Sequence, residues 1–283
     1  MTSPIAITGS TGRVGGLVAA HLAKAGVPMR LLVRTPDRAP SHPDSTVHQV
    51  SYADGRAAKA ALSGVKAAFM VSASESADRL GEHRTFVEAA AKAGVEHLVY
   101  LSFAGASPTC TFTLGRDHAA TEAAIRESGM AHTFLRDNFY ADFMAMLAGA
   151  DGVIRGPAGT GRVAVVAQGD VAAAATAVLL NPSAHRNTTY TLTGPEALTM
   201  TEVAAVVSET TGRAVSFHNE TLEEAYASRA SYGAPSWEVD AWVSTYTAIA
   251  AGEVSKVTGD IPLLTSKPAT SLRQLLSALP GSA

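Results

Sequence analysis

Three glycines, each separated from the next by two residues, lie close to the start of the chain. They follow an apolar run at residues 5–7 and precede a helix-periodic apolar run that reaches Leu22, an order that predicts a strand, a tight turn and a helix. Gly9 can make the turn, Gly12 can let backbone N–H groups approach a pyrophosphate, and Gly15 can let the helix pack closely. The N-terminus of the helix favours anions, so the alternative of a purely structural turn is the weaker interpretation. The expected dinucleotide contacts here are Gly9, Thr11, Gly12, Arg13, Val14 and Gly15.

The end of the second expected strand, residues 29–34, indicates which dinucleotide is preferred. NAD-preferring enzymes place an acid there to bind the ribose 2′-hydroxyl, whereas this strand ends in Arg34 and no acid follows until Asp37. A guanidinium can bind a 2′-phosphate through two parallel hydrogen bonds. Arg38 lies close by in the sequence, although a solvated role for one of these arginines remains open. The pattern predicts an NADP(H) site.

The proton relay of many short-chain dehydrogenases, a Tyr-x-x-x-Lys pair, is absent, because none of the seven tyrosines has a lysine four residues later. On the helix where that tyrosine is expected, His118 and Glu122 share a face, and we expect Glu122 to orient the imidazole. His118 could then donate a proton to a substrate oxygen. Ser102, at the end of a strand, could bond the substrate or only cap the strand. A structural His–carboxylate pair is the alternative for His118.

Other chemistries find no support in the sequence. The nine histidines form no His-x-x-x-His pair, and Cys110 is the only cysteine, so we expect neither a metal site nor an internal disulfide. The Gly-x-Ser-x-Gly elbow and the phosphate-loop motif are both missing. A net charge of −3 without blocks of like charge argues against nucleic acid or anionic membranes as partners. The lack of a signal pattern or of a long apolar run favours the cytoplasm.

Strands and helices alternate along the first half of the chain. Strands are expected at residues 5–7, 29–34, 46–52, 66–74, 97–102 and 131–135, with helices at 57–62, 78–92 and 116–127. This order predicts an α/β fold, a Rossmann-type doubly wound parallel sheet, with Asp54 capping the helix at 57–62. Ligands bind at the carboxyl ends of such strands, so Ser72 and Ala73 are expected to border the cofactor, unless they form only a loop of small residues.

The alternation loosens beyond residue 150. Residues 152–161 hold four glycines and a proline, which predicts a hairpin or a lobe boundary. Asp170 is expected to cap a helix at 171–180 and Ser236 a later helix, while Thr199 and Thr221 each begin a capping box. A strand is expected at 189–192, and a helix that reaches Leu147 after the sixth strand. We expect a Rossmann domain at residues 1–152 with 168–193, and a smaller C-terminal α/β lobe at 194–283 with 153–167.

Several segments together resemble NmrA-like atypical short-chain dehydrogenases/reductases, and within them the bacterial NADPH:quinone oxidoreductases and triphenylmethane reductases. These segments are the glycine turn, Leu32-Val33-Arg34, Asp117-His118-Ala119-Ala120-Thr121-Glu122, residues 133–140 and residues 248–256. The resemblance covers nearly the whole chain and is strongest over residues 5–180.

The resemblance implies NADP(H) as cofactor, with Arg34 at its 2′-phosphate, and a small lobe closing over a small aromatic or conjugated substrate. Hydride would pass directly to an acceptor such as a quinone, which can take its proton from water and needs no Tyr-Lys pair. Phe139, Tyr140 and Phe143 are the expected walls of the substrate site, unless they are ordinary core aromatics. The protein would be a monomer or a homodimer.

Two other functions remain open at this stage. The first is an NADPH-dependent ketone reductase of a biosynthetic pathway that uses His118 or Ser102 on the substrate oxygen. The second is a non-catalytic NADP(H)-sensing regulatory protein.

Overall fold

The computed structural model describes residues 3–278 of the 283-residue chain. Its contacts divide the chain into two compact units. The first unit comprises Met1–Phe103, Asp117–Arg136 and Val171–Tyr190. The second unit comprises Ala104–Arg116, Asp137–Asp170 and Thr191–Ala283.

A seven-stranded sheet forms the centre of the first unit, in the order β3-β2-β1-β4-β5-β6-β9. The strands are β1 (Ile5–Thr8), β2 (Met29–Val33), β3 (Ser45–Gln49), β4 (Ala67–Val71), β5 (His97–Phe103), β6 (Ala131–Asp137) and β9 (Thr188–Leu192). The pairs β1–β2, β2–β3, β1–β4 and β4–β5 are all parallel. The chain winds outward in one direction from β1 to β3 and in the other from β4, which confirms the predicted doubly wound sheet.

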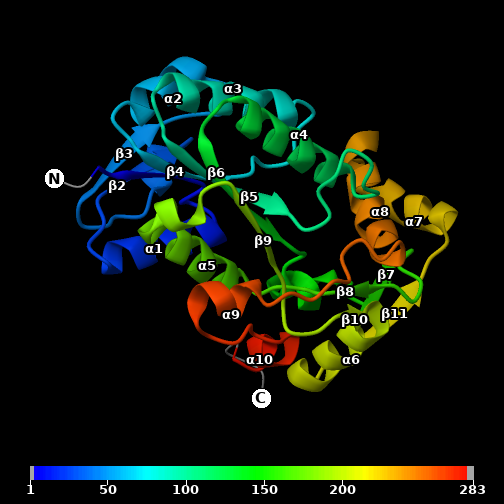
Figure 1. Cartoon of the computed structure of the whole chain (residues 1–283). Helices are drawn as coiled ribbons and strands as arrows, with labels where there is room; N and C mark the ends of the chain where they lie inside the picture. Colours follow the sequence, from blue (N-terminus) through cyan, green and yellow to red (C-terminus); the bar gives the residue numbers. More distant parts are fainter. Residues whose placement is uncertain (1–2, 279–283) are drawn as a thin grey trace. The chain divides into compact units, whose positions relative to one another are not determined.

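Helices cover both faces of this sheet (Figure 1). On one face lie α2 (Gly55–Leu62), α3 (Arg79–Lys92) and α4 (Thr113–Glu127), and on the other α1 (Arg13–Lys24) and α5 (Gln168–Leu180). Short 3-10 turns, η1 (Pro36–Arg38) and η3 (Pro182–His185), complete the connections. Parallel strands need such crossover helices, and the apolar faces of both layers are buried as a result.

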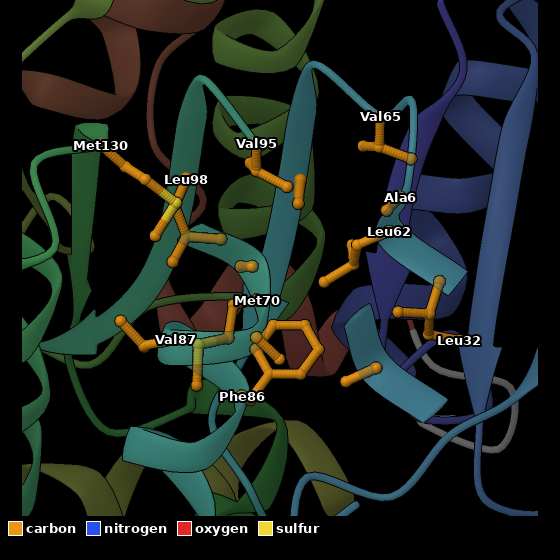
Figure 2. Packing of buried hydrophobic residues seen from close by; sticks show 14 of the residues in the cluster. Ala6, Leu32, Leu62, Val65, Met70, Phe86, Val87, Val95, Leu98 and Met130 are labelled. Carbon is orange, nitrogen blue, oxygen red and sulfur yellow. The ribbon is translucent and has the colours of Figure 1, made fainter. Parts of the chain in front are cut away.

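The core on the α2 and α3 side of the sheet is one cluster of buried apolar side chains (Figure 2). Phe86 of α3 and Met70 of β4 both lie in this cluster with no exposed surface. Buried side chains packed in this way fix the sheet against its helices, so the carboxyl ends of the strands form an edge on which a site can be built.

Two small sheets and several helices make up the second unit. β7 (Val153–Gly156) pairs in parallel with β11 (Ser216–Asn219), and β8 (Arg162–Val163) pairs antiparallel with β10 (Leu198–Thr199). The helices are α6 (Met200–Thr211), α7 (Leu222–Arg229), α8 (Ser236–Ala250), α9 (Asp260–Thr265) and α10 (Leu272–Ser277), with the 3-10 segments η2 (Ala141–Leu147) and η4 (Ala230–Tyr232). Of the two alternatives expected at residues 152–161, a hairpin or a lobe boundary, the hairpin is not formed, because β7 takes a partner more than fifty residues away.

Three of the predicted helix caps are confirmed and two are wrong. Asp54, Thr199 and Thr221 cap their helices as expected. The prediction for Asp170 was wrong, because α5 begins at Gln168 and the carboxylate instead accepts hydrogen bonds from Thr270. Ser236 is also not a cap, since Pro235 holds that position.

The helix expected to reach Leu147 is the 3-10 segment η2, and α4 begins at Thr113 rather than near Arg116. Among residues 3–278, no helix is both long enough and apolar enough to cross a membrane.

Candidate functional site

The glycine turn connects β1 to α1 through contacts that side chains would block. Gly9 has a φ of 66°, and a Cβ there would lie 2.9 Å from the Cβ of Val71. A Cβ on Gly15 would lie 2.3 Å from the carbonyl oxygen of Gly9, so the helix meets the backbone of the turn itself. Gly12 is less confined, with 3.3 Å to the same oxygen. Two of the three glycines are therefore required by the turn, whatever it binds.

The N-terminus of α1 opens from this turn without a side-chain cap. Its N-cap is Gly12, and no acidic residue stands in its first turn. The first N–H groups of a helix have no partner within the helix, so those of α1 remain available to an anion. The Ser10 hydroxyl is also buried without a hydrogen-bond partner among residues 3–278. These donors fit a pyrophosphate.

A cavity of about 260 Å³ lies beside the glycine turn, at the carboxyl ends of β1, β2 and β4. It brings together five of the predicted cofactor residues: Gly9, Thr11, Arg34, Ser72 and Ala73. Four others, Gly12, Arg13, Val14 and Gly15, lie in the adjoining N-cap and first turn of α1. Arg38 lies at the end of η1 and is not part of the lining. The position between β1 and β4 is the switch point at which ligands of such sheets bind.

Arg34 brings positive charge to the cavity. It follows β2 directly, and its exposed guanidinium lies 3.5 Å from the Ser74 hydroxyl on the opposite wall. The side chain of Gln49 donates to the Arg34 carbonyl and thereby ties the backbone at this point. An exposed guanidinium at the rim of a cavity can meet a phosphate group without first losing a buried partner.

Tyr52 and Thr8 form a part of the lining that sequence reasoning missed. The Tyr52 hydroxyl lies 2.5 Å from the Thr8 hydroxyl and donates to the carbonyl of Val71, while the Val71 N–H donates to Thr8. Burial raises the pKa of Tyr52, so its hydroxyl keeps its proton. This group links β1 to the end of β4. No sequence motif signals it, because Thr8 lies 44 residues from Tyr52 and 63 from Val71.

Ser102 lies inside the first unit rather than on the cavity lining. Its hydroxyl donates to Glu122 at 2.7 Å, and Glu122 also accepts two hydrogen bonds from Arg136 and one from Arg126. Glu122 is thus fully engaged away from His118. The expectation that Glu122 orients the His118 imidazole was wrong, because the arginine charges are its stronger partners.

His118 is buried, and both of its ring nitrogens are engaged. Nε2 lies 3.1 Å from the guanidinium of Arg79, and Nδ1 lies 2.9 Å from the hydroxyl of Tyr100. Burial, reinforced by the charge of Arg79, holds the pKa of His118 well below its usual value of 6.5. The side chain is therefore neutral near pH 7 and directs no free proton at the cavity.

Arg79 and His83 are two further residues that sequence reasoning missed. Both lie on α3, four residues apart, and both contact the backbone of Ala73 in the cavity wall. An Arg-x-x-x-His pair at the start of a helix after a strand was the available signal. By itself that spacing is too common to predict a role.

The expected substrate walls lie in the second unit. Phe139 packs edge-on against Phe112, and Tyr140 packs against the exposed Phe143. The Tyr140 hydroxyl donates to Asp137, and burial raises the pKa of that carboxyl to about 7. The substrate role of Phe139, Tyr140 and Phe143 stays a prediction. Among residues 3–278 no group of three or more His, Cys, Asp or Glu side chains could hold a metal ion.

The chain is similar in sequence and in structure to known oxidoreductases. Quinone oxidoreductase 2 of Escherichia coli strain K12 is 32% identical over 282 residues, 97% of this chain and 98% of the relative. The (4-alkanoyl-5-oxo-2,5-dihydrofuran-3-yl)methyl phosphate reductase of Streptomyces griseus is 35% identical over 275 residues, 95% of each chain. The crystal structure of Escherichia coli NADPH-dependent quinone oxidoreductase QOR2 complexed with NADPH matches with a TM-score of 0.88 and 31% identity, and the match covers 96% of this chain and 98% of that one. The model of the NmrA-like family matches residues 1–234, and the chain belongs to that family.

Proposed function

We propose that this chain is an NADPH-dependent oxidoreductase that delivers hydride to a conjugated acceptor such as a quinone. One observation carries the proposal: the uncapped start of α1 opens beside a cavity at the switch point of the sheet, with Arg34 at its rim. The relatives support it, since they include a quinone oxidoreductase and a quinone oxidoreductase structure complexed with NADPH.

Different residues around the cavity would bind different parts of NADPH. The N–H groups of the first turn of α1 and the Ser10 hydroxyl would bind the pyrophosphate. Arg34 would bind the 2′-phosphate, and Ser72 and Ala73 would border the rest of the dinucleotide. When bound, NADPH supplies the hydride. The protein's own contribution is then position and exclusion of water.

The acceptor class is inferred from the state of the two expected proton donors, His118 and Ser102. A quinone spreads the incoming electron pair over its π-system and can take its proton from water. This fits a chain without a Tyr-x-x-x-Lys pair in which both nitrogens of His118 and the hydroxyl of Ser102 are engaged. The name of the Streptomyces griseus relative describes an unsaturated lactone, another polarised π-system.

The same geometry speaks against a ketone reductase that relies on His118 or Ser102. Such an enzyme needs a donor whose proton points at the substrate oxygen. His118 is neutral near pH 7 and buried, and Ser102 donates to Glu122. A non-catalytic sensor is the remaining alternative, and turnover decides between it and the enzyme.

The experiment is a screen of NADPH oxidation at pH 7 with quinones, cationic dyes, unsaturated lactones and saturated polycyclic ketones. We expect turnover with at least one conjugated class and none with the saturated ketones. We also expect Ser102→Ala and His118→Ala to lower kcat by less than about 10²-fold, below the upper range of a positioned general acid. Binding of NADPH without turnover of any acceptor would favour the sensor, and turnover of ketones alone would favour the ketone reductase.

A further inference from the structure

Two side chains of α3, Arg79 and His83, form hydrogen bonds with the backbone of Ala73 in the cavity wall. The Ala73 N–H donates to Nε2 of His83 at 2.8 Å, and the Ala73 carbonyl accepts from Nε of Arg79 at 3.1 Å. His83 has no exposed surface and Arg79 is 4% exposed. The neighbours of Ala73 in the chain, Ser72 and Ser74, also line the cavity. The place of this wall therefore depends on two buried side chains of α3.

Three more side chains hold these two. Nη2 of Arg79 lies 3.1 Å from Nε2 of His118, and Nδ1 of His118 lies 2.9 Å from the Tyr100 hydroxyl. The Thr121 hydroxyl interacts with Tyr100 and lies 2.9 Å from Nδ1 of His83. These contacts, five hydrogen bonds and the Tyr100–Thr121 interaction, form a closed ring. We call it the Ala73 ring, and its members are Ala73, Arg79, His118, Tyr100, Thr121 and His83.

The direction of every hydrogen bond in the Ala73 ring follows from two groups that can only donate. Arginine donates to Nε2 of His118, so the proton of a neutral His118 is on Nδ1 and is donated to Tyr100. The Ala73 N–H donates to Nε2 of His83, so His83 carries its proton on Nδ1 and donates it to Thr121. Thr121 gives its own proton to the Asp117 carbonyl at 2.7 Å, and its oxygen accepts from Nδ1 of His83.

The ring closes only while both histidines are neutral, because a protonated nitrogen cannot accept. Burial and the charge of Arg79 lower the pKa of both, to about 3 for His83. The ionisable groups that act on the two histidines or on their ring partners are Arg79, Arg136, Asp117, Glu122, Tyr52 and Tyr100. The Asp117 carboxylate lies 3.3 Å from Arg79 and partly balances its charge.

We propose that the Ala73 ring is a positioning device, in which Arg79, His83, Tyr100, His118 and Thr121 hold the Ala73 wall in the conformation that accepts the nicotinamide cofactor. His118 then acts through Arg79 on the wall of the cavity and not on a substrate. The inference rests on the proposed function for the identity of the ligand. The ordering of Ala73 itself does not depend on that ligand and can be tested without it.

The decisive variant is Thr121→Val, which keeps the side-chain shape and removes the oxygen that accepts from His83. We expect the protection of the Ala73 amide against hydrogen exchange to fall about tenfold, and the Kd for NADPH to rise by a similar factor, because a buried donor loses its partner. Thr121→Ser keeps the hydroxyl and should restore both values. Tyr100→Phe removes a neighbouring bond and should act in the same direction.

The first unit offers a matched control outside the ring. Thr133 lies 2.8 Å from Nε2 of buried His97 and donates to the carbonyl of His185, so it repeats the His–Thr arrangement away from the cavity lining. Thr133→Val should leave the Kd for NADPH and the Ala73 amide within about twofold of the wild type. If Thr133→Val weakened NADPH binding and Ala73 protection as much as Thr121→Val does, the proposal would be overturned, because general destabilisation would then explain both effects.

A measurement on the unaltered protein covers the case in which the variants do not fold. ¹⁵N–¹H correlation spectra of the histidine rings at pH 7 should show the Nδ1–H tautomer for both His83 and His118. An Nε2–H tautomer at either residue, or unchanged Ala73 protection in folded Thr121→Val, overturns the ring. If the wild type binds no NADPH, the proposed function fails, while the exchange and tautomer measurements still decide whether the ring holds Ala73.

Discussion

Two helices of equal length, α1 and α6, begin in opposite ways. Each has twelve residues. At the start of α6 the Thr199 hydroxyl accepts from the Glu202 N–H, and the Glu202 carboxylate accepts from the Thr199 N–H. At the start of α1, Gly12 offers no side chain and the first turn has no acid. The capping box of α6 satisfies two of its N–H groups, whereas the start of α1 has no side-chain cap.

This difference separates groups that serve stability from groups that serve binding. A side-chain cap typically stabilises a helix by about 1 kcal/mol, so α1 forgoes that contribution. The same holds for charge, because Glu202 sits in the first turn of α6 and is bonded to Arg162, while the first turn of α1 starts with Arg13. An acid at α1 would stabilise the helix and repel a phosphate. The start of α1 is therefore less stable by itself than it could be, as expected of a binding site.

The largest effect should come from closing the uncapped start of α1 with a side chain. Gly12→Val puts a branched group where phosphates would approach the N–H groups, and we expect NADPH binding to weaken at least about 100-fold. Titration of NADPH by fluorescence measures the effect, with circular dichroism to verify folding. The matched control is Gly169→Ala in α5, where a Cβ meets nothing within 4 Å. Full affinity in Gly12→Val would mean that the phosphates bind elsewhere.

The next effect concerns the rim of the cavity. We expect wild-type protein to bind NADPH at least about tenfold more tightly than NADH, because the Arg34 guanidinium can pair with the 2′-phosphate. Arg34→Asp should remove or invert this preference by repulsion. Arg38→Asp is the control, since Arg38 does not line the cavity. Equal affinity of the wild type for the two cofactors would contradict the assignment of Arg34.

The comparison of α1 with α6 also explains how far the sequence could predict this structure. The capping box at Thr199 and the glycine turn are complete within a few residues, so local pattern was sufficient. Asp170 also stands where a cap is expected, yet its carboxylate bonds Thr270, one hundred residues away. A side chain that forms hydrogen bonds with a distant residue need not take the capping position that the local sequence predicts.

The interior of the first unit was harder to predict for the same reason. Helical spacing correctly puts His118 and Glu122 on one face, but it cannot predict that the Glu122 carboxylate accepts hydrogen bonds from Arg136 of β6. The contacts of Arg79 and His83 with Ala73 depend on how α3 packs against the end of β4. Such partners are set by tertiary packing, which periodicity does not encode.

A smaller effect should appear in acid. The pKa of His83 is about 3 in the folded protein and 6.5 in the unfolded chain, so below pH 6.5 the unfolded chain binds a proton that the folded protein does not. His83 therefore costs stability progressively as pH falls from 6.5 towards 3, by about 1 kcal/mol per pH unit. His83→Gln should show a correspondingly shallower loss in urea unfolding between pH 6 and pH 5. His218→Gln, at an exposed position, should keep the wild-type slope, and an unchanged slope in His83→Gln would contradict the buried neutral state.

The smallest effect should come from α6, and it is the converse of the Gly12 variant. Thr199→Val removes the capping hydroxyl and keeps the side-chain shape, so we expect a loss of about 1 kcal/mol, or a fall in Tm of about 2 °C. The Kd for NADPH should stay within about twofold, because the first N–H groups of α6 serve only the fold. Thr199→Ser retains the hydroxyl and should restore the Tm. A clear loss of NADPH affinity in Thr199→Val would mean that the capped start of α6 also contributes to binding. The contrast between α1 and α6 would then not separate groups that stabilise the fold from groups that bind the cofactor.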